Sequence, residues 1–145
     1  MSYSAFFAGL TALLALSSPS GSESAPDDSF VGEASYYSAR FEGKKTAFGE
    51  IFCNKHFTAA HRTFAYNTLL EVINLKNGKS VVVRVNDRGP WTKRRMIDIS
   101  QAAARKLGLM SAGTGSVKVR VVGEDGTLFE KEKNALSAVF HAGMN

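Results

Sequence analysis

The stretch Asn86-Asp87-Arg88-Gly89-Pro90 places a carboxylate at the point where a hydrophobic strand has to end. The run before it, Val81-Val82-Val83-Arg84-Val85, is rich in β-branched side chains and predicts a strand. Gly89 and Pro90 end that strand, because proline has no N–H to donate and glycine favours turns. The stretch therefore predicts a β-rich fold with Asp87 at the mouth of a strand.

The alternation of side chains along this strand predicts the surroundings of the Asp87 carboxylate. Asp87 has the parity of Val81, Val83 and Val85, so in a regular strand its side chain starts along the core-facing row. A half-desolvated carboxylate holds a proton more readily near neutral pH, which is what a general acid needs. The alternative is an Asx turn, in which the Asp87 side chain only shapes the turn.

Other segments also have the composition of strands. The predicted strands are residues 30–37, 69–74, 80–86, 96–99 and 116–122, and Asn77-Gly78 predicts a tight hairpin between the second and the third. Ser100 can cap a helix over residues 101–107, which Gly108 then ends. Residues 128–145 form either a short helix or a frayed tail. The pattern indicates a mainly β fold with one or two short helices.

Composition limits the class of protein. A chain of 145 residues with 44% hydrophobic residues fits one domain with its own core. The single cysteine, Cys53, excludes an internal disulfide, and no spacing typical of metal ligands occurs, so we expect neither metal nor cofactor. The net charge of +5 suits a polyanionic partner such as a cell wall. Nucleic acid is not expected, because the aromatic residues do not alternate with a basic stripe.

The N-terminus has the pattern of an export signal. Residues 5–16 form an apolar run that is too short to span a bilayer, and a small, polar, turn-prone segment follows it. Residues 1–4 lack the basic residues of an ordinary signal. Cleavage after Ser24 removes one acidic residue, Glu23, and leaves a more basic mature chain. We therefore expect an exported protein, periplasmic or secreted.

Five short motifs follow one another along the chain. They are Gly32-Glu33-Ala34-Ser35-Tyr36-Tyr37, Thr46-Ala47-Phe48-Gly49-Glu50, Thr58-Ala59-Ala60-His61-Arg62-Thr63, Asn86 to Pro90, and Ile97-Asp98-Ile99-Ser100. In this order the chain resembles, over residues 31–123, the rare lipoprotein A family of bacterial cell-wall proteins. The resemblance implies a six-stranded double-psi β-barrel at residues 25–127, after a signal peptide at 1–24 and before a C-terminal tail at 128–145.

The resemblance also implies an activity. In the lytic members of the family, the positions that carry activity correspond here to Glu50, His61 and Asp87. The implied enzyme is a lytic transglycosylase, which cleaves the β-1,4 bond between N-acetylmuramic acid and N-acetylglucosamine in peptide-poor peptidoglycan and leaves a 1,6-anhydro end. Asp87 is the expected general acid and base, with Glu50 and His61 tuning its protonation. The reverse assignment, with Glu50 as the acid and Asp87 as a stabilising anion, stays open.

Four residues beside these positions are candidate substrate contacts: Tyr37, Thr46, Arg88 and Trp91. Tyr37 and Trp91 either stack on sugar rings or belong to the core. Arg88 either orients Asp87 or a substrate carboxylate, or holds the turn through an ion pair.

The alternative to an enzyme is a non-catalytic wall-binding or wall-loosening module like the expansin barrels, which resemble this fold. In either case the expected partner is the peptidoglycan glycan strand, and the expected state is a monomer. The name of the family refers to a lipid-modified cysteine after the signal, but no cysteine precedes Cys53. We therefore expect no stable membrane anchor after signal cleavage.

Overall fold

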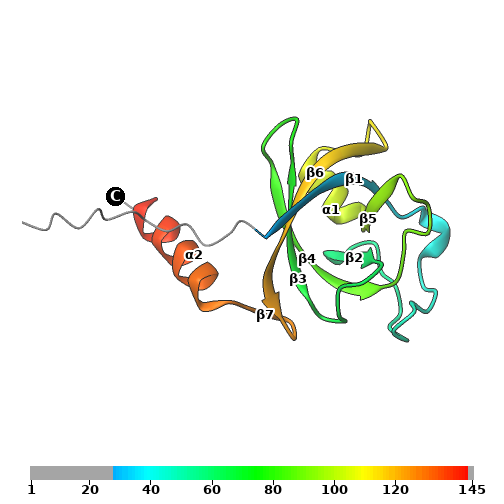
Figure 1. The fold of residues 1–145 in the computed structure, drawn as a ribbon, viewed down its shortest axis with the longest axis horizontal. Helices are drawn as coiled ribbons and strands as arrows, with labels where there is room; N and C mark the ends of the chain where they lie inside the picture. The colour runs from blue at the N-terminus through cyan, green and yellow to red at the C-terminus, as the bar shows by residue number, and fades with distance from the viewer. Residues whose placement is uncertain (1–27, 144–145) are drawn as a thin grey trace, which may run out of the picture.

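The computed structural model describes residues 28–143, which form a barrel, a short hairpin strand and two α-helices (Figure 1). The predicted signal peptide at residues 1–24 lies outside the described residues. The elements are β1 (Ser29–Tyr36), the 3-10 helix η1 (Ala39–Phe41), β2 (Thr58–His61), β3 (Leu69–Asn74), β4 (Ser80–Asp87), β5 (Arg95–Ile99), α1 (Gln101–Leu107), β6 (Thr114–Glu124), β7 (Thr127–Leu128) and α2 (Glu130–Ala142).

Six strands close the barrel. Their order is β1-β5-β2-β4-β3-β6, and β6 pairs back with β1, while β7 pairs antiparallel with the end of β6. The β1–β5 and β2–β4 pairs are parallel, and the remaining barrel pairs are antiparallel. Closure pairs the backbone groups that an open sheet leaves exposed at its edges. The predicted mainly β class, with a six-stranded barrel and two short α-helices, is confirmed.

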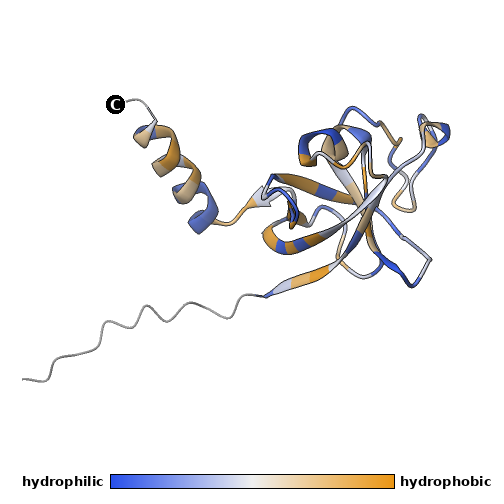
Figure 2. Ribbon diagram, turned by 90° about the horizontal axis from the view of Figure 1, so that it is seen from above, coloured by the Kyte–Doolittle hydropathy of each residue, from blue (hydrophilic) through white to orange (hydrophobic). Residues whose placement is uncertain are grey.

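Alternate residues of the strands fill the barrel with apolar side chains, and the hydropathy colouring changes along the strands accordingly (Figure 2). The buried core comprises Ala34, Ala59, Leu70, Val72, Val81, Val83, Val85, Ile97, Ile99, Val117 and Val119 from the strands, with Ala103, Ala104, Leu107 and Leu109 from α1 and the segment after it. Removing this apolar surface from water, at about 25 cal/mol per Å², is the main favourable contribution to folding.

Most of the predicted elements are present, with strand ends within two residues of those expected. Gly78 has φ 72° in the β3–β4 hairpin. The Ser100 hydroxyl caps α1 by accepting from Ala103 N, and Gly108 ends the helix with φ 71°. The sequence reading did not identify β2 as a strand, because alanine is depleted in strands and half of this one is Ala59 and Ala60.

β4 departs from regular alternation at Asn86, and this decides where Asp87 lies. Ala59 pairs with Val85 and Ala60 pairs with Asp87, so Asn86 is an extra residue on β4, as in a β-bulge. The predicted core-facing parity therefore holds only as far as Val85. The side chain of Asn86 is buried, whereas that of Asp87 is only half-buried.

Asp87 instead joins a row of residues on the outer face of the barrel. Ala60 pairs with Asp87 on one side and with Asp98 on the other, and Asp98 pairs with Ser35. Directly paired residues share one face of a sheet. Because residues adjacent to this row in the sequence, such as Ala59 beside Ala60 and Ile97 beside Asp98, lie in the core, the row itself faces outward.

The C-terminal helix α2 stands beside the barrel (Figure 1). It is tied to β6 through Arg120, whose guanidinium bonds Glu132 on α2 at 2.8 Å and Glu71 on β3 at 2.5 Å. Among residues 28–143, no helix combines the length and the apolar character that a membrane span requires.

Candidate active site

Three hydrogen-bond donors fix the Asp87 carboxylate at the end of β4. Its Oδ1 accepts from the backbone N–H of Ala47 and of Arg88, both at 2.8 Å, and its Oδ2 accepts from the Tyr37 hydroxyl at 2.6 Å. A carboxylate oxygen has two acceptor positions, so Oδ1 is filled and Oδ2 keeps one open. The open position on Oδ2 is where Asp87 can exchange a proton with a ligand.

A tight loop carries Thr46 and Glu50 to the same end of β4. The Thr46 N–H donates to Glu50 O at 2.8 Å, and Gly49, at φ 84°, closes the turn. The loop is held to the barrel by the Ala47 bond to Asp87. Thr46 is buried, and its Oγ1 has no hydrogen-bond partner within the described part of the chain.

Glu50 is held as an anion by three side chains. Arg84 forms a bidentate ion pair with Glu50, with Nη2 donating to Oε1 at 2.6 Å and Nη1 donating to Oε2 at 2.8 Å. The Tyr66 hydroxyl donates to Oε2 at 2.9 Å and Asn86 Nδ2 donates to Oε1 at 3.3 Å. The hydrogen bonds from Arg84 outweigh the opposing effect of burial and lower the pKa of Glu50 to about 2.

His61, at the end of β2, is a neutral donor. Its Nδ1 accepts from the backbone N–H of Thr63 and of Phe64, both at 3.2 Å, so the proton of the neutral ring is assigned to Nε2. The ring packs on Phe64 with centroids 4.2 Å apart. Burial, followed by the charges of Arg62 and Arg88, lowers the pKa of His61 to about 4. At neutral pH the imidazole can therefore donate from Nε2 but carries no charge.

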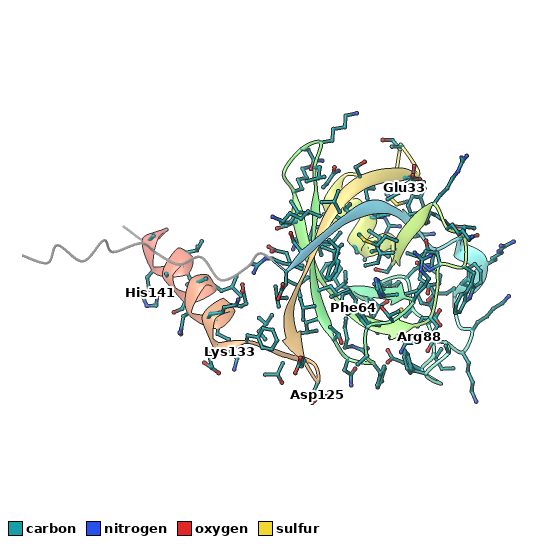
Figure 3. The ribbon with its side chains drawn as sticks, in the orientation of Figure 1. Glu33, Phe64, Arg88, Asp125, Lys133 and His141 are labelled. Carbon is teal, nitrogen blue, oxygen red and sulfur yellow. The ribbon has the colours of Figure 1, made fainter. Side chains whose placement is uncertain are left out.

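Arg88 ties together the segments around the site. Its Nη1 donates to the carbonyl oxygens of His61, at 3.2 Å, and Phe64, and its Cζ lies 4.6 Å from the centre of the Phe48 ring. Figure 3 labels Phe64 and Arg88 on the same part of the barrel. Between described residues, no ion pair joins the Arg88 guanidinium to Asp87, which receives only the Arg88 backbone N–H. The ion-pair alternative for Arg88 is therefore wrong.

The two aromatic candidates differ in exposure. Tyr37 is only 9% exposed, with its ring 4.3 Å from Phe52 and 5.6 Å from Phe41, so the prediction that it stacks on a sugar is wrong. Burial, and then the hydrogen bond and charge of Asp87, raise the pKa of Tyr37, which keeps its hydroxyl protonated. Trp91 is 77% exposed in the β4–β5 loop and is open to a ligand, so its contact with sugar stays a prediction.

A hydrogen bond joins Tyr37 to Asp87, and Glu50 is held beside them through Asn86, the residue before Asp87. Arg88, the residue after Asp87, bonds the carbonyl group of His61. Trp91 lies in the β4–β5 loop, where Arg62 bonds the carbonyl groups of its neighbours Pro90 and Thr92. Sequence reasoning missed the three residues that hold Glu50: Arg84, Tyr66 and Asn86. The sequence pattern could have indicated Arg84, because it is a charged residue at an outward position of the strand that ends at the site. No sequence pattern indicated Tyr66.

Among the described residues, no metal-ligand cluster belongs to this site, and a hollow lies apart from it. No three His, Cys, Asp or Glu side chains gather there in a way that could hold a metal ion. A hollow of about 430 Å³ is lined by residues of the β3–β4 hairpin and the α1–β6 connection, including Asn77 and Leu109. That hairpin is at the start of β4, whereas Asp87 is at its end, so the hollow is separate.

Known proteins similar to this chain match it over the barrel. A family model described as lytic transglycolase matches residues 29–119. A curated relative, the endolytic peptidoglycan transglycosylase RlpA of Haemophilus influenzae, is 48% identical over 91 residues, which are 63% of this chain and 32% of the relative. The chain therefore spans about a third of the length of this relative.

Solved structures with the same fold include Streptomyces papain inhibitor, with a TM-score of 0.54 and 25% identity over 66% of this chain and 94% of the inhibitor. Another is a mutant expansin of Clavibacter michiganensis in complex with cellohexaose, with a TM-score of 0.52 and 23% identity over 66% of this chain and 50% of the expansin. At this identity the likeness to the expansin concerns the fold.

Proposed function

The chain belongs to the lytic transglycolase family, and from this premise we propose that it cleaves peptidoglycan glycan strands as a lytic transglycosylase. The proposed bond is the β-1,4 link between N-acetylmuramic acid and N-acetylglucosamine in peptide-poor strands, with a 1,6-anhydro product. The relatives at about 50% identity that are called endolytic peptidoglycan transglycosylases support this proposal. So does the barrel site, in which one carboxylate has an acceptor position open for a proton.

That carboxylate is Asp87, the proposed general acid and base. Three donors fix its orientation, and Oδ2 keeps one acceptor position open. The reverse assignment is less favourable, because Arg84 keeps Glu50 ionised down to a pH of about 2. A carboxylate held as an anion has no proton to give to a leaving oxygen. Glu50 instead supplies a fixed negative charge beside the site.

The reaction needs only one such group. Asp87 gives its proton to the glycosidic oxygen as the bond to the leaving sugar breaks. The 6-hydroxyl of the muramic acid residue then attacks the anomeric carbon and returns a proton to Asp87. Ordinary glycosidases, in contrast, use two carboxylates on opposite sides of the bond.

His61 and Trp91 are the proposed contacts to the glycan. The Nε2–H of neutral His61 suits a hydroxyl or acetamido oxygen of the sugar, because it donates without adding charge. The exposed indole of Trp91 suits a sugar face. Thr46, whose buried hydroxyl lacks a described partner, belongs to the supporting loop.

The second candidate function is a non-catalytic wall-binding or wall-loosening module, which the exposure of Trp91 and the fold shared with an expansin favour. A binding module needs an aromatic surface but not a titratable cluster. Pulldown on purified sacculi, beside an assay of soluble release, separates the two. Binding that survives loss of Asp87, with no release by the wild type, favours the module.

We further propose export to the periplasm or outside the cell, and action as a monomer on glycan strands. The apolar run at residues 5–16 and the names of the relatives, which act on peptidoglycan, support export.

Mass spectrometry of soluble products tests the proposed reaction. Wild type and Asp87→Asn are incubated with peptide-stripped glycans. We expect anhydro-ended fragments from wild type alone, with both proteins folded. Reducing-ended fragments would mean hydrolysis and require a base that activates water. Retained cleavage by Asp87→Asn would exclude Asp87 as the acid.

A further inference from the structure

We propose that Tyr37 is a positioning residue for the proposed reaction: its hydroxyl fixes the Asp87 carboxylate so that the open position on Oδ2 faces the glycan. The inference rests on the proposed function, and it replaces sugar stacking with a role exerted through Asp87.

The Tyr37 side chain is built to hold its hydroxyl in one place. The ring packs between Phe52 and Phe41, and the side chain is 9% exposed. The backbone is fixed at both ends of the residue, because Tyr37 N donates to Ile99 O at 3.0 Å and Gln101 Nε2 donates to Tyr37 O at 3.1 Å. A hydroxyl held in this way restrains the rotation of the carboxylate that it bonds.

The charges around the hydroxyl keep its hydrogen on Tyr37. Burial opposes ionisation of the phenol most strongly, followed by the hydrogen bond and charge of Asp87 at the end of β4 and by the charge of Asp98 on β5. Asp98 is itself held by the Ser35 hydroxyl at 2.5 Å and by Arg95 Nη1 at 3.1 Å. The guanidinium of Arg88, the residue after Asp87, donates to the backbone carbonyls of His61 and Phe64. Tyr37 therefore acts toward Asp87 as a donor.

This donor assists the transfer of the proton. When the proton leaves Oδ2 for the glycosidic oxygen, Asp87 becomes a carboxylate. The hydrogen bond from Tyr37 is stronger to that carboxylate than to the carboxylic acid before transfer. An interaction that strengthens along the reaction lowers the barrier. The proton later returned by the 6-hydroxyl of the muramic acid residue restores the starting state.

The variant Tyr37→Phe tests the inference, with Tyr36→Phe as its matched control. The Phe side chain keeps the packing on Phe52 and removes only the hydroxyl. The hydroxyl of Tyr36 bonds Met110 O at 3.0 Å, and Tyr36 has no contact with Asp87 among the hydrogen bonds described. Each variant thus loses one tyrosine hydroxyl bond, but only one of them loses a bond to the acid.

In Tyr37→Phe we expect kcat to fall about tenfold or more, since a hydrogen bond to a charged group is lost. KM should change little, and the pH–rate profile should move to higher pH, because the carboxylate loses a stabilising donor. Tyr36→Phe should keep the wild-type kinetics. Wild-type kcat and an unchanged pH profile in Tyr37→Phe would overturn the inference.

A second readout does not depend on activity. The carboxyl ¹³C chemical shift of Asp87 is compared at one fixed pH in the wild type and both variants. A chemical shift that changes in Tyr37→Phe alone supports the positioning role, and equal chemical shifts in all three proteins overturn it. If the wild type releases no glycan fragments, the proposed function fails, and this comparison still decides the role of Tyr37.

Discussion

Glu50 and Arg84 join the active-site loop to strand β4 through two parallel hydrogen bonds, Nη2 to Oε1 at 2.6 Å and Nη1 to Oε2 at 2.8 Å. This geometry matches the planar guanidinium to both carboxylate oxygens and is stronger than a single contact. Glu50 lies in a loop and Arg84 lies in a strand, so the ion pair fixes the loop to the barrel. The same loop provides the backbone N–H of Ala47 that donates to Asp87.

Replacing Arg84 with glutamine should reduce the free energy of unfolding by about 1 kcal/mol at pH 7, since both partners keep some solvent exposure. The folded-state pKa of Glu50, about 2, lies below its ordinary value of 4.5. Its contribution to stability is therefore present above about pH 4.5 and is lost as pH falls toward 2. Urea unfolding between pH 2 and 7 should show a flatter dependence in Arg84→Gln.

Arg120→Gln is the control, because Arg120 also bonds carboxylates, Glu71 and Glu132, but is not connected to Asp87. It should lower stability and leave glycan cleavage unchanged. An Arg84→Gln variant with the wild-type pH dependence of stability would contradict the role given to the ion pair.

Replacing Glu50 with glutamine should reduce cleavage about 10- to 100-fold without abolishing it, because Glu50 supplies charge and loop support but no proton. The products should remain anhydro-ended. Rates of fragment release are compared with those of Asp87→Asn. Complete loss in Glu50→Gln, together with activity in Asp87→Asn, would reverse the assignment of the acid.

The imidazole of His61 should be neutral at pH 7 with its proton on Nε2, which ¹⁵N NMR of the ring distinguishes directly. Its folded-state pKa, about 4, lies below the ordinary value of 6.5, so its contribution to stability is lost as pH falls from 6.5 toward 4. In His61→Phe, the slope of stability against pH over this window should decrease. The exposed residue His56 provides the control, His56→Gln. A ring protonated at Nδ1 would exclude the proposed donor.

Replacing Trp91 with alanine should raise KM for glycan strands about 2- to 10-fold, the range expected for losing one aromatic contact. Because the indole is 77% exposed, kcat and the melting temperature should not change. Phe140→Ala is a matched control, since Phe140 is 74% exposed but lies on α2. Equal effects of the two substitutions would mean that Trp91 has no specific contact with the glycan.

Much of the barrel could be predicted because its strands obey local rules. The β-branched run before Asp87, the Asn77-Gly78 turn and the alternation in the last barrel strand each determine structure over a few residues. β2 could not be recognised in this way. Its alanines become strand residues because β4 and β5 pair with them on both sides, which is a tertiary effect.

The sequence could indicate which residues belong to the site, but it could not indicate which of them contact one another. The family resemblance indicated Asp87, Glu50 and His61, and their arrangement depends on two things that local patterns do not contain. One is the extra residue at Asn86, which changes the face on which Asp87 lies. The other is partner choice across the fold: Tyr37 is 50 residues from Asp87, and Arg84 is 34 residues from Glu50.

The extra residue at Asn86 also makes two parts of the protein free to change separately during evolution. Val85 points into the core, and after the bulge Asp87 points to the outer face, where its donors come from Tyr37 and a loop rather than from the barrel filling. Core substitutions that conserve volume can therefore accumulate without moving the acid. In the same way, the polar residues of the outer face can diversify while the barrel persists, so that one scaffold can serve proteins with different chemistry.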